Sequence, residues 1–259
     1  MNAFVTRSVS TAAGLAWAAS AAPALAQGLP AATSLDASST TPVVVIVRVP
    51  KPWCAPRALV QGKMRETIPQ YAQLPGLMFK AFSFERESSD FGGLYYWRDR
   101  SSAQGWFSPA WFERVRKERG VEGQVRMFDA LVSLDNSAGG TPADTDSAAV
   151  STLVEISIPP GVTRERLATE FAAAVPTYQK LPGLLRKHFI VSAQGTFGGV
   201  YLWKDEASAR AWFNDAWRSR VVKTYGQEAK IEWFDTPILL PTQNASNQLA
   251  SAGSMLVAR

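Results

Sequence analysis

The chain has 259 residues, 46% of them hydrophobic, and 27 basic side chains against 22 acidic ones give it a formal net charge of +5 at pH 7. Because this excess is small and the Lys and Arg residues are scattered, the composition argues against a nucleic-acid partner. A single cysteine, Cys54, excludes a disulfide within the chain, so stability must come from hydrophobic cores, for which nine Trp and thirteen Phe supply material.

The first 26 residues have the pattern of a secretory signal. Arg7 precedes an Ala-rich stretch over residues 12–22, and the small-x-small sequence at 24–26 is typical of a cleavage site. The apolar stretch is shorter than the roughly 20 residues that span a bilayer. We therefore expect a periplasmic or secreted protein that does not associate with a membrane once the signal is removed.

Segments rich in Ser, Thr, Ala, Gly and Pro divide the rest of the chain. They predict a flexible leader over residues 27–42, a linker over 136–149 and a flexible tail over 241–259. Two folded units are expected between them, at residues 43–135 and 150–240.

Both units contain the same elements in the same order. In the first, β-rich and helical patterns predict strand 43–49, helix 57–71, strands 77–85 and 91–97, a helix ending at Gly120, and strand 124–134. In the second, the same patterns predict strand 153–158, helix 163–178, strands 184–192 and 197–203, a helix ending at Gly226, and strand 230–240.

Short motifs show that the second unit repeats the first. Leu-Pro-Gly-Leu at residues 74–77 returns at 181–184, and Phe-Gly-Gly-Leu-Tyr-Tyr-Trp at 91–97 returns as Phe-Gly-Gly-Val-Tyr-Leu-Trp at 197–203. The spacing between copies is 107 residues for the first motif and 106 for the second. Such self-similarity indicates a tandem repeat of one structural unit.

The second helix of each unit has the clearest amphipathic spacing. Small and aromatic residues recur at i, i+3, i+4, i+7 and i+8 in both copies, at Ala103, Trp106, Phe107, Ala110 and Trp111 and at Ala209, Trp212, Phe213, Ala216 and Trp217. Ser108 before Pro109, and Asn214 at the matching position, are good N-cap residues. We expect both helices to kink or restart there.

The element order strand, helix, strand, strand, helix, strand is that of the ferredoxin-like α+β unit, whose helices cover one face of the sheet. The other face of such an apolar sheet must also be buried. We expect the two units to pack sheet to sheet as an intramolecular dimeric α+β barrel with the helices outside, and the chain to be a monomer with an internal pseudo-dimer.

These residues resemble a known family. Leu-Pro-Gly-Leu, the strand lysines Lys80 and Lys187, Gly-Gly-x-Tyr-x-Trp and the Phe-Asp pairs at 128–129 and 234–235 are similar to those of YdhR-like monooxygenases. That family belongs to the dimeric α+β barrel superfamily, together with the antibiotic-biosynthesis monooxygenases. The resemblance covers both units and implies an oxygenase that works without a bound cofactor on a small aromatic or apolar molecule.

The residues offer two kinds of candidate site. An aromatic pocket between sheet and helices is a candidate for substrate binding through Lys80, Tyr95, Trp97, Lys187, Tyr201, Trp203 and Trp212. His188, the single histidine, is the candidate catalytic base, although a lone His is more often structural. Its match in the first unit is Ala81, so a histidine mechanism predicts one active pocket. We expect no metal site, because the sequence has no Cys/His cluster.

Three functions fit the sequence. The first is a cofactor-free monooxygenase. The second is a periplasmic binding protein that holds an apolar ligand in the same pockets without catalysis. The third is a structural or interaction module whose pockets are filled by their own side chains. An open pocket with an ionisable group inside it would favour the first.

Overall fold

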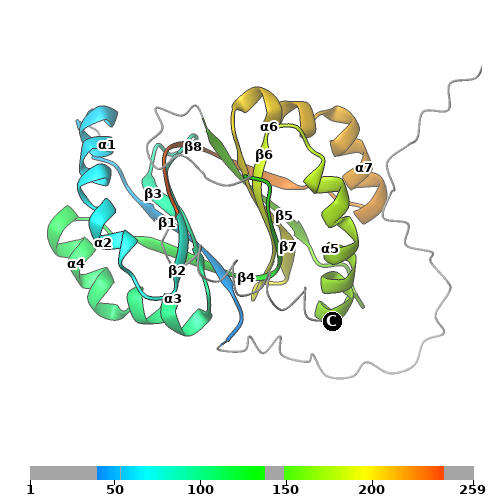
Figure 1. Cartoon of the computed structure of the whole chain (residues 1–259), viewed down its shortest axis with the longest axis horizontal. Helices are drawn as coiled ribbons and strands as arrows, with labels where there is room; N and C mark the ends of the chain where they lie inside the picture. The colour runs from blue at the N-terminus through cyan, green and yellow to red at the C-terminus, as the bar shows by residue number, and fades with distance from the viewer. Residues whose placement is uncertain (1–39, 53, 138–148, 242–259) are drawn as a thin grey trace, which may run out of the picture.

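The computed structural model describes residues 40–52, 54–137 and 149–241. The predicted signal and nearly all of the predicted leader, linker and tail lie outside these residues. Eight strands form one closed antiparallel barrel in the order β1-β3-β2-β8-β5-β7-β6-β4 (Figure 1). The strands are β1 (Val43–Val49), β2 (Leu77–Glu85), β3 (Phe91–Trp97), β4 (Gln124–Asp135), β5 (Val150–Ser157), β6 (Leu184–Ser192), β7 (Thr196–Trp203) and β8 (Lys230–Pro241).

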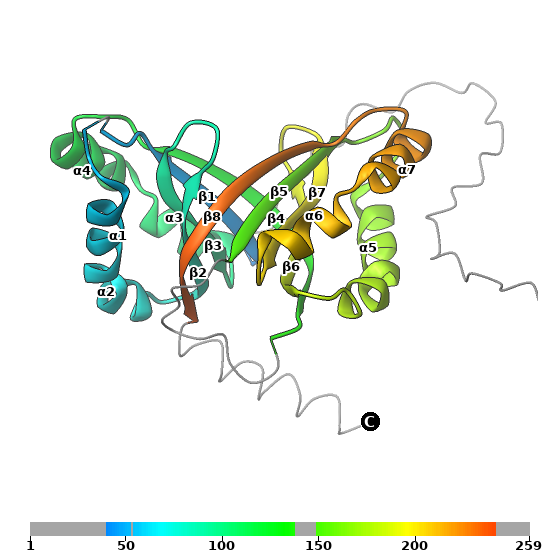
Figure 2. The same ribbon diagram turned by 90° about the horizontal axis from the view of Figure 1, so that it is seen from above.

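Helices flank the barrel on two opposite sides. The first half of the chain contributes one group, and the second half contributes the other (Figures 1 and 2). They are α1 (Arg57–Glu66), α2 (Ile68–Ala72), α3 (Arg100–Trp106) and α4 (Pro109–Arg119), then α5 (Arg164–Gln179), α6 (Glu206–Trp212) and α7 (Asp215–Tyr225). The α+β class and the ferredoxin-like order of elements agree with the sequence prediction.

The longest strands, β4 and β8, join the two halves. The first part of β4 pairs with β1 of its own half, and its last part pairs with β6 of the other half. In the same way, β8 pairs with β5 and then crosses to β2 (Figure 2). The sheets therefore do more than pack face to face, because shared strands close them into one barrel and leave no edge.

Alternate residues of β1 enter different cores, which explains why its first five residues, 43–47, are all apolar. Val45 and Val47 pack against the helices, whereas Val44 and Ile46 point into the barrel. Both faces are covered, so the strand has a continuous run of β-branched residues in place of an apolar and polar alternation.

The second helix of each half restarts where the sequence predicts it. Helices α3 and α4 separate at residues 107–108, and α6 and α7 separate at 213–214. Asn214 caps α7 by accepting a hydrogen bond from the Trp217 amide, while the Ser108 side chain makes no such bond. Gly120 and Gly226 end these helices with φ of 69° and 70°.

The first helix differs from the prediction in one half. A single helix over 57–71 is wrong, because the chain breaks at Thr67 into α1 and α2. Pro69 and Pro176 occupy matching positions, yet α5 continues through Pro176. The Thr67 hydroxyl donates to the Met64 carbonyl at 2.7 Å and supports the break, and the matching Ala174 has no group to do so.

In the part of the chain that the structure describes, no helix has the length and apolar character needed to cross a membrane.

Candidate functional site

Two buried lysines occupy matching places between the barrel and the helices. Lys80 on β2 and Lys187 on β6 are each only 2% exposed. The amine of Lys80 lies 3.0 Å from the ring centre of Tyr71, 3.8 Å from that of Phe82 and 4.5 Å from that of Tyr95. We call this group, with Trp106 beside it, the first chamber.

The second half repeats this arrangement closely. The amine of Lys187 lies 3.1 Å from the ring centre of Tyr178, 3.7 Å from that of Phe189 and 4.5 Å from that of Tyr201. With Trp212, these residues form the second chamber. Each chamber combines one amine, two phenols and one indole inside an apolar wall.

Strand pairing explains why the side chains of a chamber meet. Lys80 and Phe82 share a face of β2, and Lys80 lies directly opposite Tyr95 on β3. A Cβ atom at Gly93 would lie 3.3 Å from both the Lys80 Cε and the Tyr95 ring. A Cβ atom at Gly199 would likewise lie close to the side chains of Lys187 and Tyr201 in the second chamber. The second glycine of the Phe-Gly-Gly motif thus leaves space for the lysine and the tyrosine.

Burial disfavours the protonated form of both chamber lysines. Burial lowers the pKa of Lys80 and of Lys187 well below 10.5, and among the described residues no carboxylate forms an ion pair with either amine. The aromatic faces favour the charged form by about 0.5–2 kcal/mol. Removing an ammonium from water without a counterion costs several kcal/mol, so the effect of burial outweighs that of the aromatic faces and favours the neutral amine.

This state predicts a pH-dependent stability cost. Between its lowered folded pKa and 10.5, each lysine binds a proton in the unfolded chain but not in the folded one, so stability rises with pH. Lys80→Met should therefore stabilise the protein at pH 7, and the gain should shrink as the pH approaches 10.5. Urea unfolding at several pH values measures this difference. An exposed control, Lys180→Met, should show no such trend, and a Lys80→Met gain that grows with pH would contradict the assignment.

One tyrosine ring separates each amine from solvent. Tyr71 and Tyr178 are half-buried, whereas Tyr95 and Tyr201 beneath them are each 3% exposed. The hydroxyls of Tyr71 and Tyr95 lie 3.5 Å apart. A rotation of Tyr71 or Tyr178 away from the barrel would open a chamber that its own side chains now fill.

Each chamber also has a spare hydrogen-bond donor. The Trp106 ring packs against Tyr71 at 5.7 Å between centres, and Trp212 packs against Tyr178 at 5.5 Å. Both indole Nε1 atoms are buried, and neither has a hydrogen-bond partner among the described residues. A buried N–H without a partner costs about 1–3 kcal/mol, and an oxygen atom of a bound molecule would remove that cost.

Two residues from the predicted site form its support instead. Trp97 and Trp203 are 1% and 0% exposed and stack beside Tyr95 and Tyr201, farther from the helix-covered lysines. The sequence prediction includes Lys80, Tyr95, Lys187, Tyr201 and Trp212 but omits the walls Tyr71, Phe82, Tyr178, Phe189 and Trp106. Tyr71 and Tyr178 are spaced 107 residues apart, like the lysines, and that spacing is the signal that identifies them.

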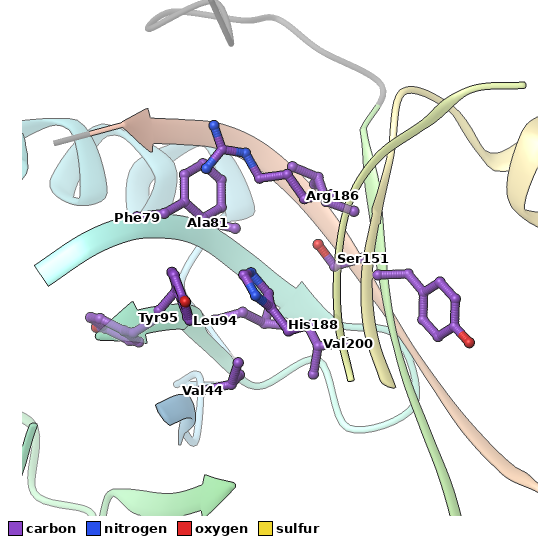
Figure 3. Close-up of a pocket in the computed structure, with 12 residues that line it drawn as sticks. Val44, Phe79, Ala81, Leu94, Tyr95, Ser151, Arg186, His188 and Val200 are labelled. Carbon is purple, nitrogen blue, oxygen red and sulfur yellow. The ribbon is translucent and has the colours of Figure 1, made fainter. Parts of the chain in front are cut away.

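His188 lies on the opposite face of β6 from Lys187, inside the barrel (Figure 3). Its ring stacks on Tyr96 at 4.2 Å, and its Nδ1 lies 2.8 Å from the Ser133 hydroxyl of β4. The β4–β6 register places Ser133 and His188 opposite each other, which the sequence alone does not reveal. Arg186, on the same face of β6, lies over the Phe79 ring at 4.3 Å.

The space beside His188 is small. The cavity there has a volume of about 20 Å³, room for about one water molecule, and is lined mainly by apolar side chains, including Val44, Phe79, Ala81, Leu94, Val200 and Leu202 (Figure 3). Burial and the Arg186 charge lower the pKa of His188 from 6.5 to about 3. Such an imidazole is neutral at physiological pH but is a weak base.

The aspartates after Phe in β4 and β8 bind arginines. Asp129 accepts from Arg100 at 2.5 Å and from Arg164 at 2.6 Å. Asp235 accepts from Arg57 and from Arg86, each at 2.8 Å. Arg57 and Arg164 begin the first helix of each half, so these pairs attach the helices of one half to a strand of the other.

No group of three or more His, Cys, Asp and Glu side chains suited to a metal ion occurs in the described part of the chain.

Comparisons with known proteins place this geometry in a wider fold group. No protein-family model and no curated protein sequence matches the chain. A crystal structure described as a "putative monooxygenase" from Fusobacterium nucleatum matches with a TM-score of 0.58 at 10% identity, covering 78% of this chain and 95% of the other. One with the same description from Lactobacillus acidophilus has a TM-score of 0.52 at 10% identity, with 78% and 96% covered.

A third structure, of an "anthrone oxidase-like protein", has a TM-score of 0.52 at 11% identity and covers 80% of this chain and 96% of the other. In all three, the match extends over more of this chain than either half alone provides. Identities this low establish similarity of fold. The chain shares its ferredoxin-like α+β fold with these three structures.

Proposed function

We propose that this protein is a cofactor-free monooxygenase that oxidises an activated CH₂ group of a small aromatic substrate in each of its two chambers, which rotation of Tyr71 or Tyr178 would open to the substrate. The observation that carries the proposal is the pair of buried amines of Lys80 and Lys187, each beneath a half-buried tyrosine and each with a pKa lowered by burial. A neutral amine with a lowered pKa is a suitable general base near physiological pH.

The overall reaction converts R₂CH₂ and O₂ into R₂C=O and H₂O. The lysine amine removes a proton from the CH₂ carbon, and the resulting carbanion donates electrons to O₂ and forms a C–O bond. Loss of water from the peroxide then forms the carbonyl group, and the lysine returns its proton to the departing oxygen. The carbon loses four electrons and the two oxygen atoms gain four, so the reaction requires no further reductant.

The other chamber residues have roles in this reaction. Aromatic rings on several sides suit a flat, apolar substrate. The unpartnered indole N–H of Trp106 or Trp212 would donate to the oxygen that becomes negative when a carbonyl-activated substrate loses its proton. This interaction strengthens as charge develops, so it favours the carbanion over the bound substrate.

Exposed arginines next to the chambers favour an acidic substrate. The Arg114 guanidinium lies 5.5 Å from the Trp106 ring centre. Its positive charge acts to lower the pKa of Tyr71, although burial has the larger effect and raises that pKa. Arg220, at the matching position of α7, acts in the same sense on Tyr178. Phenol-bearing aromatic substrates would be attracted to both entrances as phenolates.

The comparisons support the same reaction class. Two similar structures are each described as a "putative monooxygenase" and a third as an "anthrone oxidase-like protein". An anthrone has a CH₂ group activated by a carbonyl and two aromatic rings, as the reaction requires. We further propose that the two halves are copies of one YdhR-like unit that became a fused, exported pseudo-dimer, as their shared motifs and matching chambers suggest.

Oxygen uptake by the purified full chain with 1,8-dihydroxyanthrone tests the function. We expect one O₂ consumed for each anthraquinone formed, and with ¹⁸O₂ we expect one labelled atom in the new carbonyl group and one in water. Because anthrones oxidise slowly without a catalyst, the rate must be compared with a protein-free control. Saturable binding of the anthrone without faster oxygen uptake would contradict the proposal and support a binding protein.

A further inference from the structure

Four charged side chains meet on the interior face of the barrel, where its two halves adjoin. Arg48 on β1 forms an ion pair with Glu232 on β8. Arg126 on β4 donates to both carboxylate oxygens of Glu155 on β5 at 2.8 Å and lies 3.7 Å from Glu232. We call these four residues the charged quartet. Three of the side chains are at most 10% exposed, and Arg126 is 36% exposed.

The quartet occupies two pairs of equivalent positions. The β1–β3 and β5–β7 registers place Arg48 and Glu155 opposite the first glycine of their Phe-Gly-Gly strands. The β1–β4 and β5–β8 registers make Arg126 and Glu232 equivalent in the same way. The first half therefore supplies both arginines, and the second half supplies both glutamates. The charges at these equivalent positions are therefore opposite in the two halves, although most of the fold is repeated.

The ion pairs follow the same equivalence. The contact from Arg48 to Glu232 corresponds to the contact from Glu155 to Arg126, with the signs exchanged. In a barrel built from two first halves, arginine would face arginine at both contacts, and in one built from two second halves, glutamate would face glutamate. Like charges that are largely removed from water repel strongly.

We propose that the charged quartet makes the interior face of each half specific for the other half, so that the chain closes its barrel upon itself and rejects a second copy of the same half. Attraction at each contact favours closure of the barrel within one chain. Repulsion between two first halves, or between two second halves, disfavours association between chains. The inference concerns assembly and holds whether or not the chambers oxidise a substrate.

Charge reversal in the full chain tests the proposal. Arg48→Glu with Arg126→Glu makes the quartet wholly acidic, and Glu155→Arg with Glu232→Arg makes it wholly basic. Each double variant turns both ion pairs into like charges and should lower the midpoint of thermal unfolding by about 10 °C or more. The fourfold variant that combines both changes exchanges the signs and should recover a large part of this loss.

Two neighbouring charges should prevent the fourfold variant from recovering the full stability of the wild type. Glu85 lies 3.4 Å from Arg48, and Lys230 lies 2.7 Å from Glu232. Both would face a like charge in the fourfold variant. The decisive comparison is therefore between the fourfold variant and the two double variants, in which the same neighbours are present.

Light scattering should give the mass of one chain for the wild type and for the fourfold variant. Arg116→Glu, which breaks the exposed pair with Glu122, controls for charge reversal at the surface and should change the midpoint by less than about 2 °C. The proposal is overturned if the fourfold variant is no more stable than the double variants, because then the particular side chains and not their signs matter. Double variants as stable as the wild type would overturn it as well.

Discussion

Replacing both chamber lysines, Lys80→Met with Lys187→Met, is expected to lower the turnover number for anthrone oxidation by about 10²- to 10⁴-fold, because the reaction loses its general base in both chambers. Each single variant should keep about half of the wild-type turnover, since the two chambers have the same geometry. Methionine fills a similar volume without an amine, so the fold is expected to persist.

The pH dependence gives an independent readout of the same base. In the wild type, turnover should fall as the pH drops through the lowered pKa of the lysines, because protonation removes the base. Oxygen uptake across a pH series measures it. Wild-type turnover in the double lysine variant would contradict the lysine mechanism.

His188→Ala separates the two candidate bases. The sequence hypothesis of a histidine base in the second half alone predicts a loss of about 10²- to 10⁴-fold for this variant. The lysine mechanism predicts turnover close to that of the wild type, because a base with a pKa of about 3 in a 20 Å³ cavity has little capacity to remove a proton from carbon. A large loss of turnover in His188→Ala, together with an active lysine double variant, would identify His188 as the general base.

The largest single-residue effect on stability is expected from Gly198→Ala. A Cβ atom at this position would lie 1.9 Å from the Val154 carbonyl oxygen, a backbone atom of the neighbouring strand β5 that no side-chain rotation can move. The strands must separate there, and we expect a loss of about 3 kcal/mol or more in the free energy of unfolding. Urea denaturation followed by tryptophan fluorescence measures it.

A second glycine provides the control. A methyl group added to Gly105 in α3 would have no neighbouring atom within 4 Å, and the helical backbone there suits alanine. Gly105→Ala should leave stability unchanged or raise it by up to about 1 kcal/mol. If Gly198→Ala were as stable as the wild type, the close approach of β5 and β7 would be wrong.

The order of strands and helices was predictable from the sequence, because it depends on local periodicity and on motifs that occur twice, but the break of the first helix at Thr67 was missed. The alternation in Phe-Gly-Gly-x-Tyr-x-Trp placed Tyr95 and Trp97 on one face, and the N-cap residues Ser108 and Asn214 predicted where the second helix of each half restarts. Even the division of Lys187 and His188 between opposite faces follows from the two-residue period of a strand.

Tertiary structure decided which residues become neighbours, because long-range contacts depend on strand register and on burial. The exchange of β4 and β8 between halves places Ser133 beside His188 and pairs Arg48 with Glu232 across 184 residues of sequence. Nothing local to Lys80 distinguishes a solvated lysine from a neutral one. Its chemistry is set by Tyr71, Phe82 and Tyr95, which exclude water from the amine without offering it a counterion.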